Sequence, residues 1–398
     1  MADLKQSALD YHEFPKPGKL SVDSSKACDT ADDLSLAYSP GVAAPVVEIV
    51  NNPDNAYRFT NKGNLVAVIT NGTAVLGLGD VGPLASKPVM EGKGVLFKKF
   101  AGIDVFDIEI DCKNPDEFIQ TVVNISPTFG GINLEDIAAP HCFYIENELK
   151  KRLTIPVFHD DQHGTAVIVA AALQNAMEIQ RKNISDVKIV FLGAGAAGCS
   201  CARFLKLRGA KHITMVDRKG ILHTKRKDLN KYNQDLAIIT ESRLLSEAML
   251  NSDVFIGVSG ANLLDETNVR LMAKNPIIFA LANPDPEILP SQAHAIRDDI
   301  VMATGRSDFP NQVNNVLGFP FLFKGALDAK ATEITNDMLL AAANALALLA
   351  KEPVPQSVLD AYQADKMNFG PEYLIPKPFD PRLMDWVAKA VKEAYVNG

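Results

Sequence analysis

The sequence predicts an α/β protein of two domains, each built around a mostly parallel sheet. Apolar runs rich in Val, Ile and Phe alternate with helical patterns, as in sheets covered by helices. A second such series starts at VKIVFLGAGAAG, where a glycine-rich turn directly follows an apolar run. Because 398 residues exceed what one ordinary core accommodates, we place a boundary near residue 160 and expect domains over 1–160 and 161–398.

The first domain contains four predicted strands, which are apolar runs bounded by Gly, Asn or Asp: LVAVIT (65–70), AVLGLG (74–79), DVFDIEI (104–110) and IPVFH (155–159). Helices are predicted over 114–125 and 142–151. The first of them begins with Asn, Pro and acidic residues, which helix N-termini prefer. A longer alanine-rich helix over 164–182 suits close packing between layers.

The second domain continues the alternation with five predicted strands: VKIVFL (187–192), HITMVD (212–217), DVFIGVS (253–259), PIIFALAN (276–283) and DIVMATG (299–305). A buried helix is predicted over 338–350, where Pro353 and Pro355 follow as stop signals. The proline-rich segment 371–382 is expected to be extended, and a final helix is predicted over 383–396.

Composition argues against several classes of function. A net charge of −8 without long basic tracts argues against a nucleic-acid partner, and we interpret the short cluster HTKRKDLNK (223–231) as a solvated loop. No segment is apolar over the length of a membrane span, and the first residues lack the apolar core of a signal peptide. Five cysteines without a CxxC pair predict free thiols. We therefore expect a soluble cytoplasmic protein.

A GxGxxG motif predicts a dinucleotide site, because it directly follows a strand and opens a helix. The first glycine permits a tight turn, the second lets the backbone approach the pyrophosphate, and the third lets helix and strand pack closely. The free N–H groups of the helix N-terminus then face the phosphates. The predicted cofactor loop consists of Gly193, Ala194, Gly195, Ala196, Ala197 and Gly198.

Asp217 ends the next predicted strand, 19 residues beyond Gly198, where an acid can bind the ribose hydroxyls. Its carboxylate favours NAD, because it repels the 2′-phosphate of NADP. Arg218 and Lys219 follow at once and offer that phosphate a partner. The sequence therefore leaves the choice between NAD and NADP open.

Two acidic pairs, Glu135–Asp136 and Asp160–Asp161, each follow a predicted strand in the first domain. The carboxyl ends of parallel strands line the ligand crevice of an open sheet, so these side chains are expected to converge. Four converging carboxylates repel one another unless a cation is present, and oxygen ligands suit Mg²⁺ or Mn²⁺ rather than zinc. Acids also stabilise helix N-termini, so spacing alone leaves helix capping as an alternative.

Other polar residues are ambiguous when taken alone. His159 and His163 flank the second acidic pair, but the strand-like PVFH argues against an HxxxH metal site, so we interpret them as supporting residues. Lys93 stands between two glycines before an expected helix, and Tyr38 lies on a Ser-Pro-Gly turn. Each of the two is compatible with a plain surface or packing role.

Seven motifs in order resemble the short microbial malic enzymes: AYSPGVA, VMEGKG, NLED, PVFHDDQHGTA, GAGAAG, LANPDPEI and VNNVLGFP. The resemblance covers essentially the whole chain. It implies an N-terminal α/β malic-enzyme domain followed by a Rossmann-type, doubly wound NAD(P)-binding domain with C-terminal helices. It also implies oxidation of malate with NAD or NADP, followed by decarboxylation of bound oxaloacetate to pyruvate and carbon dioxide.

The resemblance further implies roles for individual residues. Glu135, Asp136 and Asp161 match the ligands of a catalytic Mg²⁺ or Mn²⁺. Lys93 matches the general base, with a pKa depressed by burial and by the cation, and Asp160 matches the residue that orients it. Tyr38 matches the acid that protonates C3 of enolpyruvate. The remaining matches are Asn283, Asn314 and Asn315 toward the substrate carboxylate and nicotinamide ribose, and Ser259 and Gly260 along the cofactor.

The chain departs from longer relatives at two places. An arginine that grips a malate carboxylate in animal-type enzymes is replaced by Ala74, so Ser86, Lys87 or another subunit is expected to supply that contact. The chain ends at Gly398, so we expect no acyltransferase-like extension. Relatives are dimers or larger, and we expect at least a homodimer in which Tyr38 reaches the partner's site.

Three alternatives differ from this interpretation. Malolactic conversion uses the same architecture but returns the hydride to pyruvate and releases no reduced cofactor. An amino- or hydroxy-acid dehydrogenase shares the two-domain plan but needs no metal. A nucleotide-sensing module would keep GAGAAG but has no need of Lys93, Tyr38 and four positioned carboxylates together.

Overall fold

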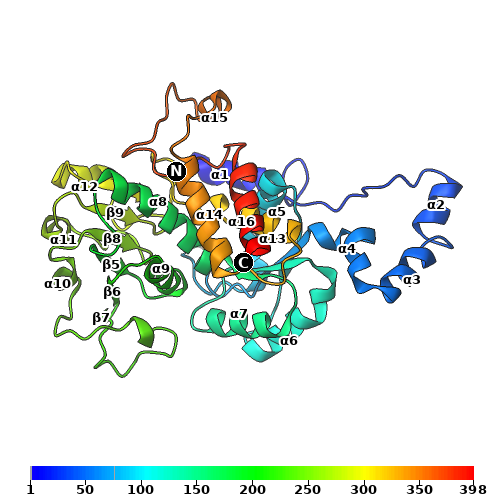
Figure 1. Ribbon diagram of the computed structural model, residues 1–398, viewed down its shortest axis with the longest axis horizontal. Helices are drawn as coiled ribbons and strands as arrows, with labels where there is room; N and C mark the ends of the chain where they lie inside the picture. The colour runs from blue at the N-terminus through cyan, green and yellow to red at the C-terminus, as the bar shows by residue number, and fades with distance from the viewer. Residues whose placement is uncertain (1, 76) are drawn as a thin grey trace.

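The computed structural model describes residues 2–75 and 77–398. It contains two sheets, one of four strands in the order β2-β1-β3-β4 and one of six in the order β10-β9-β8-β5-β6-β7. Helices cover both sheets, and α8, α13, α14 and α16 lie in the middle of the molecule (Figure 1). The predicted α/β class is therefore confirmed.

The first sheet is parallel throughout. Its strands are β1 (Leu65–Thr70), β2 (Asp104–Glu109), β3 (Gly131–Leu134) and β4 (Val157–His159). Ile69 pairs with Leu134, and Leu134 pairs with His159, so the three neighbouring strands end at the same edge. This register brings the two segments that follow β3 and β4 together beside that edge.

The helices of the first half are α1 (Ala2–Glu13), α2 (Ala31–Ala37), α3 (Ala43–Asn51), α4 (Ala56–Phe59), α5 (Pro83–Ala101), α6 (Pro115–Ile125) and α7 (His141–Arg152). The helices predicted over 114–125 and 142–151 correspond to α6 and α7 within a residue. Asn114 caps α6 as its sequence suggests, because its side chain accepts hydrogen bonds from the N–H groups of Asp116 and Glu117.

Residues 31–51, which we call the N-terminal arm, project away from the two sheets (Figure 1). Neither of its helices, α2 and α3, contains a buried residue. The arm nevertheless carries seven exposed large apolar side chains, namely Leu34, Leu36, Tyr38, Val42, Val46, Val47 and Val50. Such a contiguous apolar surface marks an interaction site on an otherwise ordinary protein surface.

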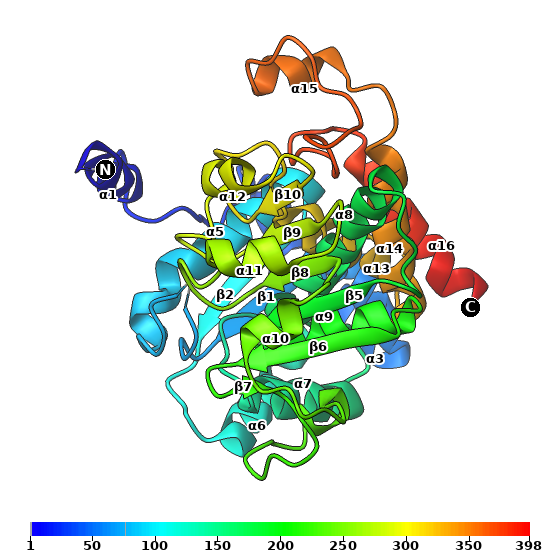
Figure 2. The ribbon, with the colours of Figure 1, turned by 90° about the vertical axis from the view of Figure 1, so that its left-hand side faces the viewer.

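The second sheet has five parallel strands, β5 (Lys188–Leu192), β6 (His212–Asp217), β8 (Val254–Gly257), β9 (Ile277–Ala280) and β10 (Val301–Thr304), and faces the viewer in Figure 2. A short strand, β7 (Gly220–Ile221), pairs antiparallel with β6. From β5 the chain first builds outward to β6 and then returns to place β8 on the other side. The strand order thus reverses between β5 and β8, where open α/β sheets bind their ligands.

The helices of the second half are α8 (Thr165–Ile179), α9 (Ala196–Leu207), α10 (Leu245–Met249), α11 (Glu266–Leu271), α12 (Pro290–Ile296), α13 (Phe319–Asp328), α14 (Asn336–Leu349), α15 (Gln356–Ala361) and α16 (Lys389–Asn397). π-helical turns over Asp160–Gly164 and Met384–Ala388 precede α8 and α16. None of the described helices is long and apolar enough to cross a membrane.

One buried apolar cluster extends from the first sheet into the second. Aromatic rings connect the parts: Phe97 of α5 packs edge-on against Phe319 and Phe323 of α13, at centroid distances of 4.7 and 5.3 Å. Phe158 of β4 also contacts Phe323. The start of α13 is therefore fixed against the first sheet, although it lies far along the chain. A domain boundary near residue 160 remains our proposal.

One predicted strand, AVLGLG (74–79), is wrong. Val75 and Gly79 instead form an isolated antiparallel bridge, and Gly77 and Gly79 adopt φ angles of +76° and +82°, which favour glycine over other residues. Leu76 lies outside the described residues. The alternation of glycine with apolar residues therefore reflects a turn rather than a strand.

Lys93 lies inside a helix and not before one. α5 runs through VMEGKG because its glycines accommodate the N-terminal segment. A Cβ on Gly94 would lie 2.6 Å from Leu20 Cδ1, and the Lys19 ammonium donates to Pro88 O at 2.6 Å. The sequence interpretation placed Lys93 before a helix, whereas α5 extends from Pro83 to Ala101 and contains both glycines.

Candidate functional site

Three carboxylates meet at the carboxyl edge of the first sheet. Glu135, Asp136 and Asp161 each present one oxygen within 4.8 Å of the others. Asp136 has a φ of 52°, an unusual value that aspartate tolerates, and its N–H donates to Asp161 Oδ2 at 2.9 Å. Asn133 donates to Glu135 Oε2 at 2.9 Å. The backbone and a neighbouring amide thus hold the carboxylates together.

The electrostatics of this cluster favour a cation. Burial raises the pKa of Glu135 well above its usual value; Lys93 opposes the rise, and Asp161, Asp160 and Asp136 add to it. Helix capping does not explain the acids, because α7, the π-helical turn and α8 all begin without a side-chain cap hydrogen bond. The all-oxygen donor set fits Mg²⁺ or Mn²⁺.

Lys93 points from α5 into the cluster. Its ammonium forms an ion pair with Asp160 and another with Glu135 Oε1 at 3.0 Å, and it lies 4.5 Å from the centre of the Phe319 ring. Burial lowers the pKa of Lys93, as expected, but Asp160 and Glu135 outweigh burial and raise it above its usual value. The expected depression of this pKa is therefore not produced by the protein's own groups.

Asp160 is fully buried and held from two sides. Asn315 Nδ2 donates to Asp160 Oδ2 at 2.9 Å, and Asn315 Oδ1 accepts from the Thr165 hydroxyl at 3.2 Å. A Cβ on Gly164 would overlap Asp160 Oδ1, which explains the glycine in HDDQHG. The π-helical turn therefore directs the Asp160 side chain toward Lys93, whereas the next residue, Asp161, joins Glu135 and Asp136.

The two histidines support this edge without entering the carboxylate group. His159 is fully buried, its Nδ1 lies 3.7 Å from Asp161 Oδ2, and burial lowers its pKa. His163 Nε2 contacts the buried Glu146 carboxylate at 2.8 Å. Both positions agree with supporting residues rather than a histidine metal site.

Three further residues named from the sequence are Tyr38, Ser86 and Lys87. The Tyr38 side chain is on the N-terminal arm, with 71% of its surface exposed. Lys87 pairs with Asp107 at 2.6 Å, and the Ser86 hydroxyl donates to Pro83 O at 2.6 Å. Both side chains thus have partners of their own, and the replacement of the arginine absent at Ala74 stays a prediction.

The glycine loop between β5 and α9 has the geometry that its motif predicts. Gly193 adopts a φ of +120°, and a Cβ there would lie 2.7 Å from Val258 O. A Cβ on Gly198 would overlap Gly193 O, whereas one on Gly195 would meet nothing within 4 Å. The second glycine thus faces open space at the N-terminus of α9, with Ala194, Ala196 and Ala197 around it.

Arg226 changes the interpretation of Asp217. Its guanidinium donates to Asp217 Oδ1 and Oδ2 at 2.9 and 2.7 Å and also binds Asp228. The Arg226 side chain is only 9% exposed. The interpretation of residues 223–231 as a solvated loop was therefore wrong for Arg226. Arg218 is exposed and forms no ion pair with any described residue. Sequence spacing gave no signal that Arg226 folds back onto β6.

The remaining predicted residues lie in loops at the carboxyl ends of strands or before α13. Ser259 and Gly260 follow β8, and Asn283 follows β9. A Cβ on Gly77 would lie 2.8 Å from Asn283 O, so the glycine turn of the first domain abuts this loop. Asn315 reaches Asp160, as described above, whereas Asn314 Oδ1 accepts from Val316 N–H at 3.0 Å.

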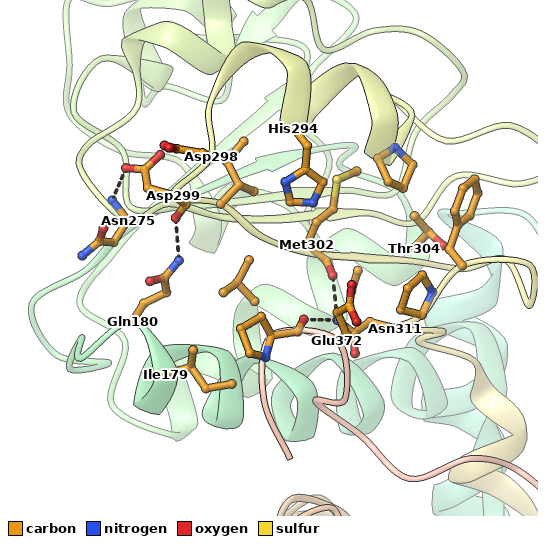
Figure 3. A pocket seen from close by; sticks show the side chains of 17 residues that line it. Ile179, Gln180, Asn275, His294, Asp298, Asp299, Met302, Thr304, Asn311 and Glu372 are labelled. Atoms are coloured by element: carbon orange, nitrogen blue, oxygen red, sulfur yellow. Dashed lines mark hydrogen bonds between the residues drawn. The ribbon is translucent and has the colours of Figure 1, made fainter. Parts of the chain in front are cut away.

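A cavity of about 450 Å³ lies beside β10, and none of the candidate site residues lines it (Figure 3). Gln180 donates to Asp299 O at 2.8 Å, and Asn311 Nδ2 donates to Met302 O and Pro371 O at 2.9 and 2.6 Å. Its polar side chains thus join segments of the protein, and the cavity plays no part in the candidate site.

Comparison with known proteins identifies relatives over the whole length. The model of the malic enzyme N-terminal domain matches residues 17–115 and 113–150, and that of the malic enzyme NAD binding domain matches 162–361. The NADP-dependent malic enzyme of Halomonas elongata is 57% identical over 100% of this chain and 95% of its own. A crystal structure of malic enzyme from Pyrococcus horikoshii has a TM-score of 0.90 at 42% identity, covering 99% of this chain and 91% of the other.

Some relatives are longer. The NADP-dependent malic enzyme of Escherichia coli is 56% identical over 98% of this chain, but the match spans only 52% of that protein. The chain therefore spans about half the length of this relative and nearly all of the Halomonas protein.

The carboxylate group generates a first prediction. Asp161→Asn should weaken Mn²⁺ binding at least about tenfold, because it removes a full negative charge from the cluster. Electron paramagnetic resonance of free Mn²⁺ measures the affinity directly on the purified protein. Asp111→Asn, which alters an exposed carboxylate after β2, is the matched control and should leave the affinity unchanged. Equal affinities of wild type and Asp161→Asn would rule out this cluster as the cation site.

Proposed function

The chain belongs to the malic enzyme family, and we propose that it oxidises (S)-malate and decarboxylates the product to pyruvate and carbon dioxide, with reduction of NAD(P)⁺. The observation that carries the chemistry is the buried contact of Lys93 with Asp160 and Glu135, beside Asp136 and Asp161. A lysine in this position faces a candidate cation site.

We assign Lys93 the removal of the proton from the 2-hydroxyl of malate, since it is the cationic side chain that the fold directs into the carboxylate group. Asp160 and Asn315 orient it. Glu135, Asp136 and Asp161 would hold Mg²⁺ or Mn²⁺, which as a Lewis acid would polarise the 2-oxygen and offset the negative charge that keeps Lys93 protonated. The loops that follow β8 and β9 would hold the nicotinamide, which would supply the acceptor for the hydride of C2.

The function is tested by assaying malate turnover with Mn²⁺ and either NAD⁺ or NADP⁺. Pyruvate and reduced cofactor should appear in equal amounts, and EDTA should stop the reaction. Lys93→Ala should lower kcat at least about a hundredfold through loss of the base, while Lys98→Ala, an exposed lysine on the same helix, should not. Lactate without reduced cofactor would indicate malolactic conversion, and turnover insensitive to EDTA would indicate a metal-free dehydrogenase.

We propose that the protein works as a homodimer and that Tyr38 protonates C3 of enolpyruvate in the partner's site. The N-terminal arm supports this, because it exposes contiguous apolar side chains and contacts little of its own chain. Tyr38 directly follows α2 of that arm, whereas Lys93 belongs to α5, which lies apart from α2 and α3 (Figure 1). An arm of this composition is stabilised by docking on a second copy, and closed two-fold exchange is the simplest arrangement.

Complementation distinguishes the two placements of Tyr38. Lys93→Ala and Tyr38→Phe should each form little pyruvate alone, but mixed dimers should contain one site with both native residues. Random mixing after dissociation should then restore about a quarter of wild-type activity, because half of the dimers are mixed and each has one intact site. No recovery, in dimers shown by mass spectrometry to have exchanged subunits, would place Tyr38 and Lys93 of one chain in the same site.

We propose that the cofactor is NADP⁺ in preference to NAD⁺. Arg226 occupies both oxygens of Asp217, so this carboxylate neither repels a 2′-phosphate fully nor is free to accept both ribose hydroxyls. The neighbouring Arg218 is exposed and free to pair with the phosphate.

The free thiols of all five cysteines fit a reducing compartment, and we propose the cytoplasm.

Arg218→Ala should lower kcat/KM for NADP⁺ at least about tenfold, through loss of a charge-assisted contact to the 2′-phosphate. The value for NAD⁺ should stay unchanged, since that cofactor lacks the phosphate. Steady-state kinetics with both cofactors measure the ratio, and Lys211→Ala, an exposed cation before β6, is the control. Equal losses for both cofactors would contradict a role of Arg218 in their discrimination.

A further inference from the structure

Glu287 is a fully buried glutamate that joins the loop after β8 to the loop after β9, to which it belongs. Its carboxylate accepts a hydrogen bond from Ser259 N–H at 2.9 Å and another from Ala282 N–H at 3.1 Å. Ser259 belongs to the first loop, and Ala282 directly precedes Asn283 in the second. A single side chain thus bridges the two loops that are assigned to the nicotinamide end of the cofactor.

The backbone around Glu287 strengthens the same bridge. Glu287 O accepts from Leu264 N–H at 3.0 Å, and Pro286 O accepts from Asn262 N–H at 3.1 Å. These bonds fix the far end of the β8 loop to the segment that carries Glu287. The carboxylate therefore holds the near end of the loop while the main chain holds its far end.

No cationic side chain of the described residues forms an ion pair with Glu287. Burial raises its pKa, and the backbone N–H groups oppose that rise only in part. A buried carboxyl group without a counter-charge is unfavourable for folding, and an apolar residue of similar size would fill the same space more favourably. The contribution of the Glu287 side chain is therefore its hydrogen bonds with Ser259 N–H and Ala282 N–H rather than its packing.

Gly257, the last residue of β8, lies directly against the Glu287 carboxylate. A Cβ at this position would overlap the Glu287 carboxyl carbon and lie 2.6 and 2.7 Å from its two oxygens. Gly257 has no positive φ angle that would otherwise require glycine. The missing side chain therefore makes room for Glu287 against the end of the strand.

We propose that Glu287 is a positioning residue for the cofactor, which sets the separation of the Ser259–Gly260 and Asn283 loops and thereby the affinity for NAD(P). This rests on the proposed function only in that those loops contact the nicotinamide half. Glu287 itself is buried beneath them and touches neither substrate nor cofactor.

Glu287→Gln tests the proposal while keeping the size of the side chain. One amide oxygen remains to accept a hydrogen bond, but the amide nitrogen faces the other N–H group, so one loop is released. The dissociation constant of NADPH, measured from its own fluorescence without malate or metal, should rise at least about tenfold. KM for the oxidised cofactor should rise in parallel, with kcat at saturation within about threefold. Glu266→Gln, on the exposed start of α11, is the matched control.

Gly257→Ala provides a second route to the same effect, because it displaces the carboxylate without removing it. Hydrogen exchange of the cofactor-free wild type should find the N–H groups of Ser259 and Ala282 protected. Unchanged NADPH affinity in a folded Glu287→Gln, or fast exchange at both N–H groups, would overturn the proposal. So would lower kcat and thermal stability at unchanged cofactor affinity, which indicate a purely structural role. Binding is measured without turnover, so a wild type inactive on malate would contradict the proposed function and leave this test intact.

Discussion

The ion pair that Lys93 forms with Asp160 and Glu135 is the contact on which the arrangement of the site depends. It joins a helix, the end of β3 and the end of β4, and Asn315 extends it to the segment before α13. Breaking a buried pair by removing one partner costs about 3–5 kcal/mol, because the remaining charge stays buried. Two glycines leave room beside this ion pair. Gly164 makes space for the Asp160 carboxylate, and Gly94 lets Leu20 pack against α5.

The two sheet edges differ in the groups that they present: mainly charged side chains at the first sheet and mainly backbone groups at the second. At the edge of the first sheet, buried carboxylates gather around Lys93, and a bound cation would reduce their mutual repulsion further. At the edge of the second sheet, Gly195 faces open space at the N-terminus of α9, and Glu287 accepts hydrogen bonds from backbone N–H groups of two loops. The aromatic contacts of α13 fix the segment before it, which carries Asn315, against the first sheet.

Periodicity and glycine spacing predicted the strands and helices on which these edges are built, because each of those signals is local. They failed where tertiary packing overrides local preference: Gly92 and Gly94 lie inside α5 because Lys19 and Leu20 pack there, and AVLGLG is a turn. Spacing placed the carboxylates at strand ends but left capping open, and only the register of β3 and β4 brings them within reach of one ion. Arg226 escaped prediction because a salt bridge across nine residues of loop has no sequence signature.

The proposed dimer would account for the exposed apolar side chains of the N-terminal arm. These side chains gain stability only by docking, at about 25 cal/mol for each Å² removed from water, so the arm is ordered most strongly in an assembly. If Tyr38 acts as proposed, subunit association and the final protonation would become one equilibrium, whereas the contacts of Lys93 with Asp160 and Glu135 form within one chain. Dilution below the dissociation constant of the proposed dimer would therefore remove the C3 proton donor first and leave the base and the cation site in place. The oxidation and protonation steps would then respond differently to protein concentration, which a site built from one chain cannot reproduce.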